Sequence, residues 1–345
     1  MNAQEGKAQL SALTAWISQH APQLGSALSL QKFDAGQSNP SFLLKCDHRQ
    51  LVLRRKPAGE LLASAHAVDR EFRLISALQN TPVPVPEAIA LCEDNSVIGS
   101  MFYLMSYEPG DILWDPALPE IIRNRRADYY FSLVGTLAEL HRVDYKACGL
   151  EDFGKPGNYY ARQLARWSSQ YEASATAVIN EMDQLITWLA DNTPADDGQS
   201  CIIHGDYRLD NVIFHRGESK IRAVLDWELA TLGHPMADLA YYLMALRLPR
   251  TGEIKGLQNE DLATLGIPDE DSLIDHYCHV RGINRPAHTE FYLAFSFFRL
   301  AAILQGVYKR GLDGNASSER AIRMGKLVQP LAAMGLSVTR QAAGI

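Results

Sequence analysis

The sequence predicts an α+β fold with two lobes, a small β-rich N-terminal lobe with one key helix and a larger, mostly helical C-terminal lobe. The chain has 345 residues, 47% of them hydrophobic, which is enough apolar material for two lobes. Short β-like runs dominate residues 28–107, whereas helical spacing dominates from residue 111 onward. We therefore expect the lobes at residues 1–110 and 111–345.

The N-terminal lobe is expected to begin with a helix and to continue as strands. Leu10, Leu13 and Ile17 have helical spacing, and Pro22 ends that run. A second helix is expected over residues 64–78, after the first three strands. The expected strands are 28–33, 41–46, 50–55, 87–93 and 96–107.

The C-terminal lobe is helical by pattern, with one strand-rich interruption at residues 201–227. Short polar hairpins among helices are unusual and mark a site. The most apolar stretch, Phe291–Leu304, carries Arg299 and is expected to be too short to span a bilayer. The expected helices are 127–141, 159–171, 177–190, 236–246, 272–281, 287–310 and 318–331.

Charge and cysteine content exclude several classes of protein. The formal net charge is −7, whereas proteins that neutralise nucleic-acid backbones are normally basic, so we expect no nucleic-acid partner. The five cysteines are scattered and form no CxxC pair, which argues against a disulfide framework and a thiolate zinc site. The N-terminal residues lack the pattern of a signal peptide. We expect a soluble cytoplasmic protein with no membrane partner.

Residues 204–211 read His-Gly-Asp-Tyr-Arg-Leu-Asp-Asn and lead into a strand, and Asp226 ends the returning strand. Phosphoryl transfer from ATP needs a carboxylate that orients the attacking hydroxyl and metal ions that neutralise the phosphates. Asp206 supplies such a carboxylate, and Asn211 supplies an oxygen ligand for Mg²⁺. The hairpin then returns a second carboxylate, Asp226, to the same edge. The pattern indicates a kinase active site.

These motifs resemble the aminoglycoside phosphotransferase (APH) family, whose fold is that of the eukaryotic protein kinases. The resemblance implies that Asp206 is the catalytic base and that Asn211 and Asp226 bind Mg²⁺. It also implies that His204 and Asp238 support the loop structurally, the latter from the run Gly-His-Pro-Met-Ala-Asp-Leu-Ala. The catalytic loop is then 201–228, and the C-terminal helices bind the acceptor.

Glu71 lies inside an apolar helical stripe that contains Val68 and Ile75. A carboxylate on a core-facing stripe is costly unless a cation meets it. In the kinase fold that cation comes from the third strand, where this chain has Arg54 in place of the usual lysine. Arg54 is favoured as the partner of Glu71 and of the ATP phosphates, and Lys56 is the alternative because it lies on the same strand face.

Two further segments are expected to contact the nucleotide. The turn between the first two strands lies where the kinase fold has its phosphate-covering loop, so its backbone N–H groups are expected to cap the phosphates. By resemblance, the backbone at the junction of the lobes hydrogen-bonds adenine. The residues expected in these two roles are Gly36, Gln37, Ser38 and Asn39 for phosphate, and Met105 and Tyr107 for adenine.

The acceptor is indicated less directly. From His234 to the end the chain has 11 Asp and Glu against 12 Lys and Arg, whereas a cleft for polycationic aminoglycosides is expected to be acidic. Arg299 differs from the other basic residues because apolar residues crowd its helix. Several short sequence segments, among them LVLRRKP and HPMADLAYYL, resemble the branch of the family that is fused to acyl-CoA dehydrogenases in some animals. That branch implies a hydroxyacyl-CoA as acceptor.

Four alternatives stay open beside this prediction. The first is an antibiotic-modifying phosphotransferase, and the second is a non-catalytic nucleotide-binding or scaffolding module. The third is a hydrolytic metal site formed by His204, Asp206 and His215. The fourth, a protein kinase, is disfavoured because only about ten residues separate Asp226 from the next helix, too few for a peptide-docking loop.

Overall fold

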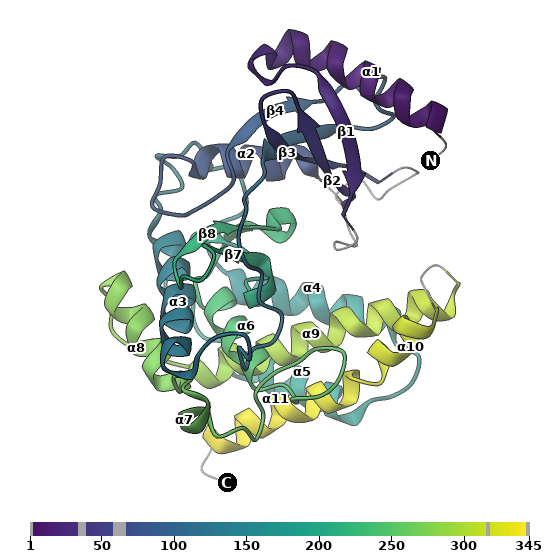
Figure 1. Ribbon diagram of the computed structural model, residues 1–345. Helices are drawn as coiled ribbons and strands as arrows, with labels where there is room; N and C mark the ends of the chain where they lie inside the picture. Colours follow the sequence, from purple (N-terminus) through teal and green to yellow (C-terminus); the bar gives the residue numbers. More distant parts are fainter. Residues whose placement is uncertain (1–2, 34–38, 58–66, 315–317, 343–345) are drawn as a thin grey trace. The chain divides into compact units, whose positions relative to one another are not determined.

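The computed structural model describes residues 3–33, 39–57, 67–314 and 318–342, which form two compact units (Figure 1). The sheet unit comprises Met1–Ile112, Lys146–Leu150 and Asn211–Ala230. The helical unit comprises Leu113–Tyr145, Glu151–Asp210 and Thr231–Ile345. Contacts therefore group residues 211–230 with the N-terminal part of the chain, whereas the lobe boundary at residue 110 stays a prediction.

The sheet unit is built on a five-stranded antiparallel sheet with the strand order β1-β2-β3-β5-β4. The expected strands at 41–46 and 50–55 have the bounds predicted for them. The expected helix at 64–78 is described from Val68, since residues 64–66 lie outside the described part of the chain. The elements are α1 (Ala3–His20), β1 (Ala27–Lys32), β2 (Ser41–Cys46), β3 (Gln50–Arg55), α2 (Val68–Leu78), β4 (Ala88–Cys92) and β5 (Phe102–Ser106).

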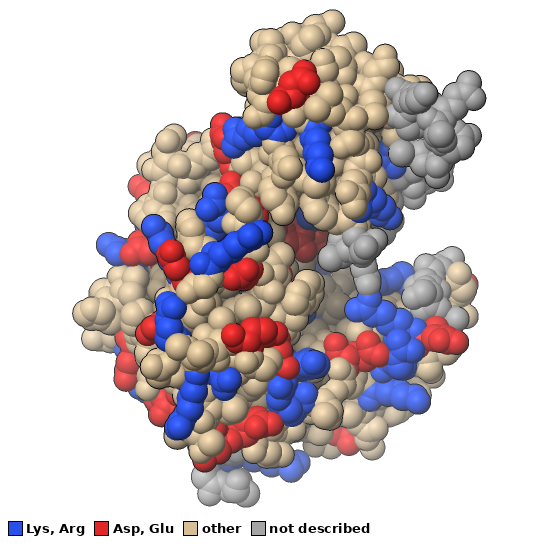
Figure 2. Space-filling view, viewed as in Figure 1, with Lys and Arg blue, Asp and Glu red and all other residues tan. Residues whose placement is uncertain are grey.

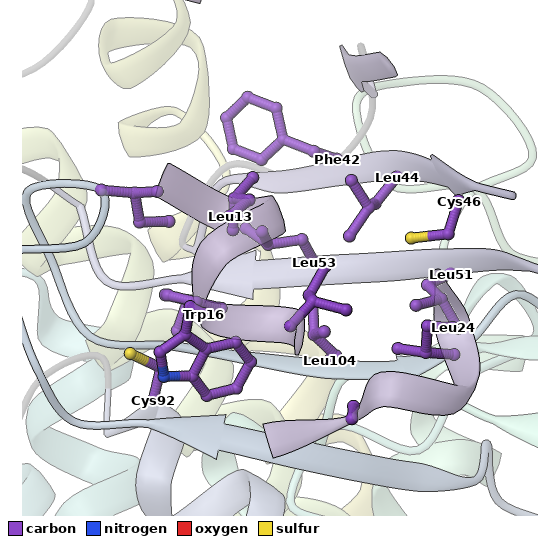
Figure 3. Packing of buried hydrophobic residues seen from close by; sticks show 14 residues of the cluster. Leu13, Trp16, Leu24, Phe42, Leu44, Cys46, Leu51, Leu53, Cys92 and Leu104 are labelled. Carbon is purple, nitrogen blue, oxygen red and sulfur yellow. The ribbon is translucent and has the colours of Figure 1, made fainter. Parts of the chain in front are cut away.

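The two faces of this sheet are covered by different helices. Leu53 and its cross-strand partner Leu104 are fully buried in a cluster with Leu13 and Trp16 of α1 (Figure 3). Because successive side chains of a strand point to opposite faces, the next pair, Arg54 and Tyr103, faces the other way. Helix α2 lies on that second face, where Phe72 packs against the Tyr103 ring.

A short hairpin, β7 (Val212–Phe214) and β8 (Ile221–Val224), joins the sheet unit through backbone hydrogen bonds. Asp111 and Phe214 exchange two N–H···O bonds of 2.9 Å, and the N–H of Val224 donates to the carbonyl of Pro84. The 3₁₀ turn η4 (Trp227–Leu229) that follows packs against α2. The hairpin thus carries its last residues to the α2 face of the sheet.

The helical unit is organised around α9 (Thr289–Leu312), which packs against α4, α5, α6, α10 and α11. A two-stranded sheet of β6 and β9 carries the start of the His-Gly-Asp segment. The other elements are α3 (Arg126–Arg142), α4 (Tyr159–Ser174), α5 (Asn180–Asp191), β6 (Cys201–Ile203), β9 (Thr231–Gly233), α6 (Met236–Leu246), α7 (Leu262–Leu265), α8 (Glu270–Arg281), α10 (Ser318–Gly325) and α11 (Val328–Ala342).

Helix α9 corrects one expectation. By length and composition its 24 residues could cross a membrane, so the expectation that this stretch is too short was wrong. However, 72% of its most apolar window is buried inside the protein. The apolar composition is explained by burial, because α9 is surrounded by other helices of its unit.

Other differences lie at element boundaries. The strand expected at 96–107 begins only at Phe102, because the chain turns at Gly99, whose φ is +85°. The helix expected at 177–190 begins at Asn180, and Val178, which precedes it, is 81% exposed. The helix expected at 318–331 is two helices, α10 and α11. The α+β class itself is confirmed.

Charges of both signs are interspersed over the face shown in Figure 2. Many charged side chains of the protein are paired within a unit, for example Arg247 with Glu270 at 2.5 Å and Arg250 with Asp115 at 2.8 Å. Such partly exposed pairs contribute little stability each, about 0–1 kcal/mol. They are consistent with the balanced charge count of the C-terminal residues.

Candidate active site

The ion pair expected in the sheet unit is present, and Arg54 makes it. Nε of Arg54 lies 2.9 Å from Oε2 of Glu71, at an angle that makes no hydrogen bond. Both side chains are buried, with 12% and 2% exposed. Lys56, the alternative, lies 3.8 Å from Asp69 and is about a third exposed. The alternation along β3 explains this outcome, because Arg54 faces α2 directly and the strand ends at Arg55.

Two more carboxylates surround Arg54. Its Nη2 donates to Oδ1 of Asp226 and lies 3.6 Å from Oε2 of Glu228. Both residues come from the turn after β8, which packs against α2. One guanidinium therefore faces three carboxylates, which leaves an excess of negative charge in this part of the unit.

The burial of Glu71 has an electrostatic consequence. Burial raises the pKa of Glu71 to about 7, although Arg54 opposes the shift, and Asp226 and Glu228 add to it. Burial also acts against the charge of Arg54, but Glu71 and Asp226 outweigh it and raise the pKa of the guanidinium. Arg54 is the cation that makes this group of carboxylates tolerable in the interior.

The hairpin register places Asn211 next to Asp226. Val212 pairs with Val224, and the carbonyl of Asn211 accepts a hydrogen bond of 2.8 Å from the N–H of Leu225. Asp226 has φ +63°, the left-handed region that Asp tolerates better than most residues. Its side chain is 37% exposed. Asn211 and Asp226, two side chains whose oxygens could bind a metal ion, are thus held at one end of the hairpin.

This donor set fits Mg²⁺. The ion prefers oxygen ligands and usually binds through one or two carboxylates, keeping several waters. In the described part of the chain no group of three or more His, Cys, Asp or Glu could hold a metal ion. The pair Asn211 and Asp226 matches the small number of protein ligands that Mg²⁺ requires.

The other expected nucleotide contacts are only partly described. Gly36, Gln37 and Ser38 lie outside the described residues, whereas Asn39 is buried and its amide Nδ2 lies 3.4 Å from Oε2 of Glu228. Met105 lies within β5, between β3 and β4. The N–H of Tyr107 donates to the carbonyl of Gln50. The roles of these residues toward phosphate and adenine stay predictions.

In the helical unit, Asp238 holds the backbone of the His-Gly-Asp segment. Its carboxylate accepts from the N–H of His204 at 2.6 Å and from the N–H of Gly205 at 2.8 Å. Nδ1 of His204 accepts from the N–H of Asp206 at 3.2 Å. His204 and Asp238 are fully buried, whereas Asp206 is partly exposed. Two buried side chains thus fix the loop that presents Asp206.

Asp238 is itself held by His141 of α3. Nε2 of His141 lies 3.3 Å from Oδ2 of Asp238, and Nδ1 lies 2.6 Å from the hydroxyl of Tyr277. Burial lowers the pKa of His141, so it is neutral at pH 7. Burial alone would raise the pKa of Asp238, but the hydrogen bonds from His141 and His204 lower it. The carboxylate of Asp238 is therefore ionised, and both of its oxygens accept hydrogen bonds.

The expected catalytic base and the expected Mg²⁺ ligands belong to different units. Asp206 lies in the helical unit, and Asn211 and Asp226 lie in the sheet unit. The chain passes from one unit to the other between Asp210 and Asn211. Asp210 is paired with Arg208 by two hydrogen bonds within the helical unit.

The alternative hydrolytic metal site finds no support. The ring of His204 is buried and bonded to the backbone N–H of Asp206. His215 lies in the sheet unit, where its Nδ1 is 3.4 Å from Nη1 of Arg222. No metal-holding group that includes these histidines occurs among the described residues.

Sequence reasoning missed Glu228, Tyr103 and Tyr241. Glu228 and Tyr103 lie beside the ion pair of Arg54 and Glu71, and Tyr241 donates to Asp206. The position of Tyr103, opposite Arg54 in the next strand of the sheet, is a signal only once the strand order is known. Tyr241 is three residues after Asp238, so helical spacing on α6 identifies it once Asp238 is placed.

Comparison with known proteins decides the family. A family model described as the phosphotransferase enzyme family (APH) matches residues 29–273. The chain belongs to this phosphotransferase family. The resemblance drawn from the motifs is thereby confirmed, as is the expected enzyme class, a phosphotransferase with an alcohol group as acceptor.

The relatives of this phosphotransferase include larger proteins. Acyl-CoA dehydrogenase family member 10 of Mus musculus is 48% identical over 88% of the chain and 28% of the relative. Member 11 of Rattus norvegicus is 43% identical over 97% of the chain and 44% of the relative. The phosphotransferase chain thus spans less than half the length of these curated relatives.

Two solved structures show the likeness in three dimensions. One from Ralstonia eutropha JMP134, assigned provisionally as an aminoglycoside phosphotransferase, has a TM-score of 0.89 and 45% identity, and covers 96% of this chain and 98% of its own. A spectinomycin phosphotransferase in complex with ADP and spectinomycin has a TM-score of 0.62 and 10% identity, with 95% and 98% covered. The second likeness shows the fold alone.

Proposed function

We propose that this phosphotransferase is an ATP- and Mg²⁺-dependent small-molecule kinase that transfers the γ-phosphate to a hydroxyl of a hydroxyacyl-CoA. One observation carries the proposal: Asp206 is partly exposed on a loop whose backbone is bound by the buried carboxylate of Asp238. A carboxylate presented on a fixed backbone suits a base that must meet a hydroxyl in one geometry.

Asp206 acts as the base. Its carboxylate accepts the proton of the acceptor hydroxyl as the oxygen attacks the γ-phosphorus. The bond between that phosphorus and the β,γ-bridging oxygen breaks, and ADP leaves with the bonding electrons. The products are the phosphate ester and ADP, and the proton passes from Asp206 to solvent. His204 and Asp238 support the loop and touch neither substrate.

The sheet unit supplies the nucleotide contacts. Arg54, positioned by Glu71, neutralises phosphate oxygens, and the backbone N–H groups of Gly36, Gln37, Ser38 and Asn39 are proposed to contact them. The backbone at Met105 and Tyr107 binds adenine. Asn211 and Asp226 would hold Mg²⁺, which supplies charge neutralisation at the β- and γ-phosphates. The spectinomycin phosphotransferase with ADP, which shares the fold, supports nucleotide binding.

Two observations support a hydroxyacyl-CoA as the acceptor. The relatives that align with nearly the whole chain are acyl-CoA dehydrogenase family members, in which this phosphotransferase corresponds to one part. The C-terminal residues that are expected to line the acceptor site are balanced in charge, 11 acidic against 12 basic, and so do not favour a polycation. An anionic CoA ester suits that balance better than an aminoglycoside does.

We also infer that the protein acts in the cytoplasm. Four of its five cysteines, Cys46, Cys92, Cys201 and Cys278, are buried thiols outside any disulfide. Free buried thiols are typical of a reducing compartment.

A transfer assay tests the function. Short- and medium-chain 3- and 4-hydroxyacyl-CoAs and kanamycin are each incubated with ATP and Mg²⁺, and the phosphorylated product is measured by mass spectrometry. We expect phosphate on the acyl-CoA, reduced about 10²–10⁴-fold in Asp206→Asn because the base is lost. Asp313→Asn, which alters an exposed carboxylate paired with Lys309, is the matched control and retains activity.

The outcomes separate the alternatives. Transfer to kanamycin alone assigns the protein to antibiotic modification. Bound ATP without transfer to any acceptor favours the non-catalytic module. Full activity of Asp206→Asn contradicts the role of Asp206 as base, whichever acceptor is used.

A further inference from the structure

Side chains hold both backbone hydrogen-bonding groups of Gly205. Its N–H donates to Oδ1 of Asp238 at 2.8 Å, and its carbonyl accepts from Nη2 of Arg299 at 3.0 Å. Asp238 lies on α6 and Arg299 on α9, two helices that pack together. Gly205 has φ +84°, which a residue with a Cβ rarely adopts. The backbone just before Asp206 is therefore held from two helices.

Tyr241 contacts the carboxylate of Asp206 directly. It lies three residues after Asp238 on α6, so both side chains share one face of that helix. Its hydroxyl donates to Oδ1 of Asp206 at 2.8 Å, and only 8% of Tyr241 is exposed. Burial, and then the nearby carboxylate of Asp206, raise the pKa of Tyr241, so the hydroxyl keeps the proton that it donates. A buried donor thus orients one carboxylate oxygen.

Arg299 connects the two contacts. Its guanidinium carbon lies 5.7 Å from the centroid of the Tyr241 ring and 5.8 Å from that of Trp167 on α4. A guanidinium at such a distance from an aromatic ring is attracted to it electrostatically. The same group donates to the carbonyl of Gly205. Arg299 therefore fixes both the loop backbone and the ring that carries the donor to Asp206.

The basic residue that stood out in the sequence is thus already engaged. Arg299 lies on the apolar helix α9, and its charge is compensated by a carbonyl and two rings. A charged group on a mostly buried helix is costly unless polar partners meet it. This arrangement explains how Arg299 is accommodated without an anionic ligand.

We propose that Tyr241 and Arg299 are positioning residues for Asp206: Tyr241 orients its carboxylate, and Arg299 holds the peptide before it and the Tyr241 ring. The inference rests on the proposed function, in which Asp206 accepts the hydroxyl proton. A base that rotates freely spends little time in the productive geometry, and small misplacements of reacting groups cost up to about 10²-fold in rate. The two residues act through Asp206 and touch no substrate.

Tyr241→Phe tests the orienting hydrogen bond, because it removes the hydroxyl and keeps the ring. The matched control is Tyr242→Phe: Tyr242 is also buried, and its hydroxyl has no hydrogen-bond partner in the described part of the chain. With ATP, Mg²⁺ and a short-chain 4-hydroxyacyl-CoA, we expect kcat to fall roughly tenfold or more in Tyr241→Phe, with KM for ATP unchanged. Tyr242→Phe retains wild-type kcat. Equal kcat in both variants overturns the role of Tyr241.

Arg299→Met and Arg299→Lys separate positioning from substrate binding. If Arg299 positions the loop, kcat falls in Arg299→Met while KM for the acyl-CoA stays within about twofold, and Arg299→Lys restores part of kcat because a cation again meets the carbonyl. A rise of KM for the acyl-CoA with kcat unchanged would instead make Arg299 a substrate ligand and overturn the proposal.

A readout without catalysis distinguishes this inference from the proposed function. Amide hydrogen exchange of the peptide that contains residues 203–208 is expected to speed up severalfold in Arg299→Met and to stay unchanged in Tyr242→Phe. If the wild type transfers no phosphate, the proposed function fails, and the exchange rates still decide whether Arg299 holds the loop. Unchanged exchange in Arg299→Met overturns that contact's role.

Discussion

Glu71 is a buried carboxylate whose ionisation opposes folding. Its pKa is raised to about 7 by burial, whereas the same side chain in an unfolded chain titrates near 4.5. Between these values Glu71 binds more protons in the folded protein than in the unfolded chain, so the contribution of Glu71 to stability is greatest below pH 4.5 and is lost as pH rises through 7. A buried carboxylate beside Arg54 thus contributes positioning at the expense of stability at neutral pH.

This linkage predicts a pH effect that a single substitution removes. From pH 5 to pH 8, Glu71 is expected to lower the free energy of unfolding by about 2 kcal/mol, and Glu71→Gln to lack that decline because glutamine does not titrate. Urea unfolding of both proteins, followed by tryptophan fluorescence at the two pH values, measures the difference. Parallel pH profiles for the two proteins would contradict the raised pKa.

The contact between Glu71 and Arg54 could be predicted from the local sequence. The apolar stripe around Glu71 indicated a buried carboxylate that needs a cation, and the period of two along β3 favoured Arg54, which makes the contact. Nothing in the local sequence indicated Glu228 or Tyr103, because their proximity to Arg54 depends on the strand order and on the turn after β8. Contacts made by the fold are visible only after the fold is known.

At the scale of elements, the hairpin β7–β8 has to approach the backbone at Gly110 very closely. A Cβ on Gly110 would lie 2.2 Å from the carbonyl oxygen of Phe214 and 2.4 Å from Cγ2 of Ile213. The first of these atoms belongs to backbone that also pairs with Asp111 and so cannot shift without breaking that pairing. Glycine at this position allows the hairpin, and with it Asp226, to dock.

Gly110→Ala is therefore expected to lower the free energy of unfolding by about 1–3 kcal/mol, the usual cost of overpacking, and to lower kcat because the end of the hairpin that is proposed to bind Mg²⁺ is displaced. Gly306→Ala is the control: in α9 the nearest atom to its added Cβ, Nη1 of Arg310, is 3.5 Å away, so the substitution is neutral or slightly stabilising. Thermal unfolding and the transfer assay measure both effects. Equal stability of the two variants would contradict the close approach.

Helices and strands were predictable where the periodic pattern of apolar residues extends over enough residues. The bounds of β2, β3 and α6 agree with the pattern, whereas β9 was missed because three residues are too few to show a period of two. One expected helix is two, α10 and α11, and α10 ends at Gly325, whose added Cβ would lie 2.4 Å from the Tyr308 ring of α9. That break depends on packing against another helix, which no local pattern contains.

At the scale of the whole molecule, the chain passes between its two units several times. Residues 146–150 and 211–230 return to the sheet unit after the helical unit has begun. The sequence suggested one crossing near residue 110, where β-like runs give way to helical spacing. Such a change of pattern shows where a segment lies in the chain, but it does not show what the segment packs against. The site residues Asn211 and Asp226 were predicted from their motif, but their membership of the sheet unit was not.

This organisation predicts that the sheet unit is incomplete when the chain is cut where the β-like pattern gives way to the helical pattern. A fragment of residues 1–112 lacks Asp226 and Glu228, so Arg54 keeps only Glu71 as a buried partner, and the carbonyl of Pro84 and both backbone groups of Asp111 lose their hydrogen bonds to the hairpin. Leaving such groups unpaired costs about 1–3 kcal/mol each if they stay buried. We expect the fragment to unfold at a lower temperature, and less cooperatively, than the same fragment fused through a flexible Gly/Ser linker to residues 211–230.

Circular dichroism melts of the two fragments provide the measurement, and ATP binding by calorimetry provides a second one. The fused fragment carries Arg54, Glu71, Asn211 and Asp226 together, and so is expected to bind ATP with Mg²⁺ more tightly than the shorter fragment. A third fragment, in which Asp226→Asn is introduced into the fusion, separates the structural effect of the hairpin from the proposed binding of Mg²⁺ by the Asp226 carboxylate. Equal melting of fused and unfused fragments would mean that the hairpin is not an integral part of the sheet unit.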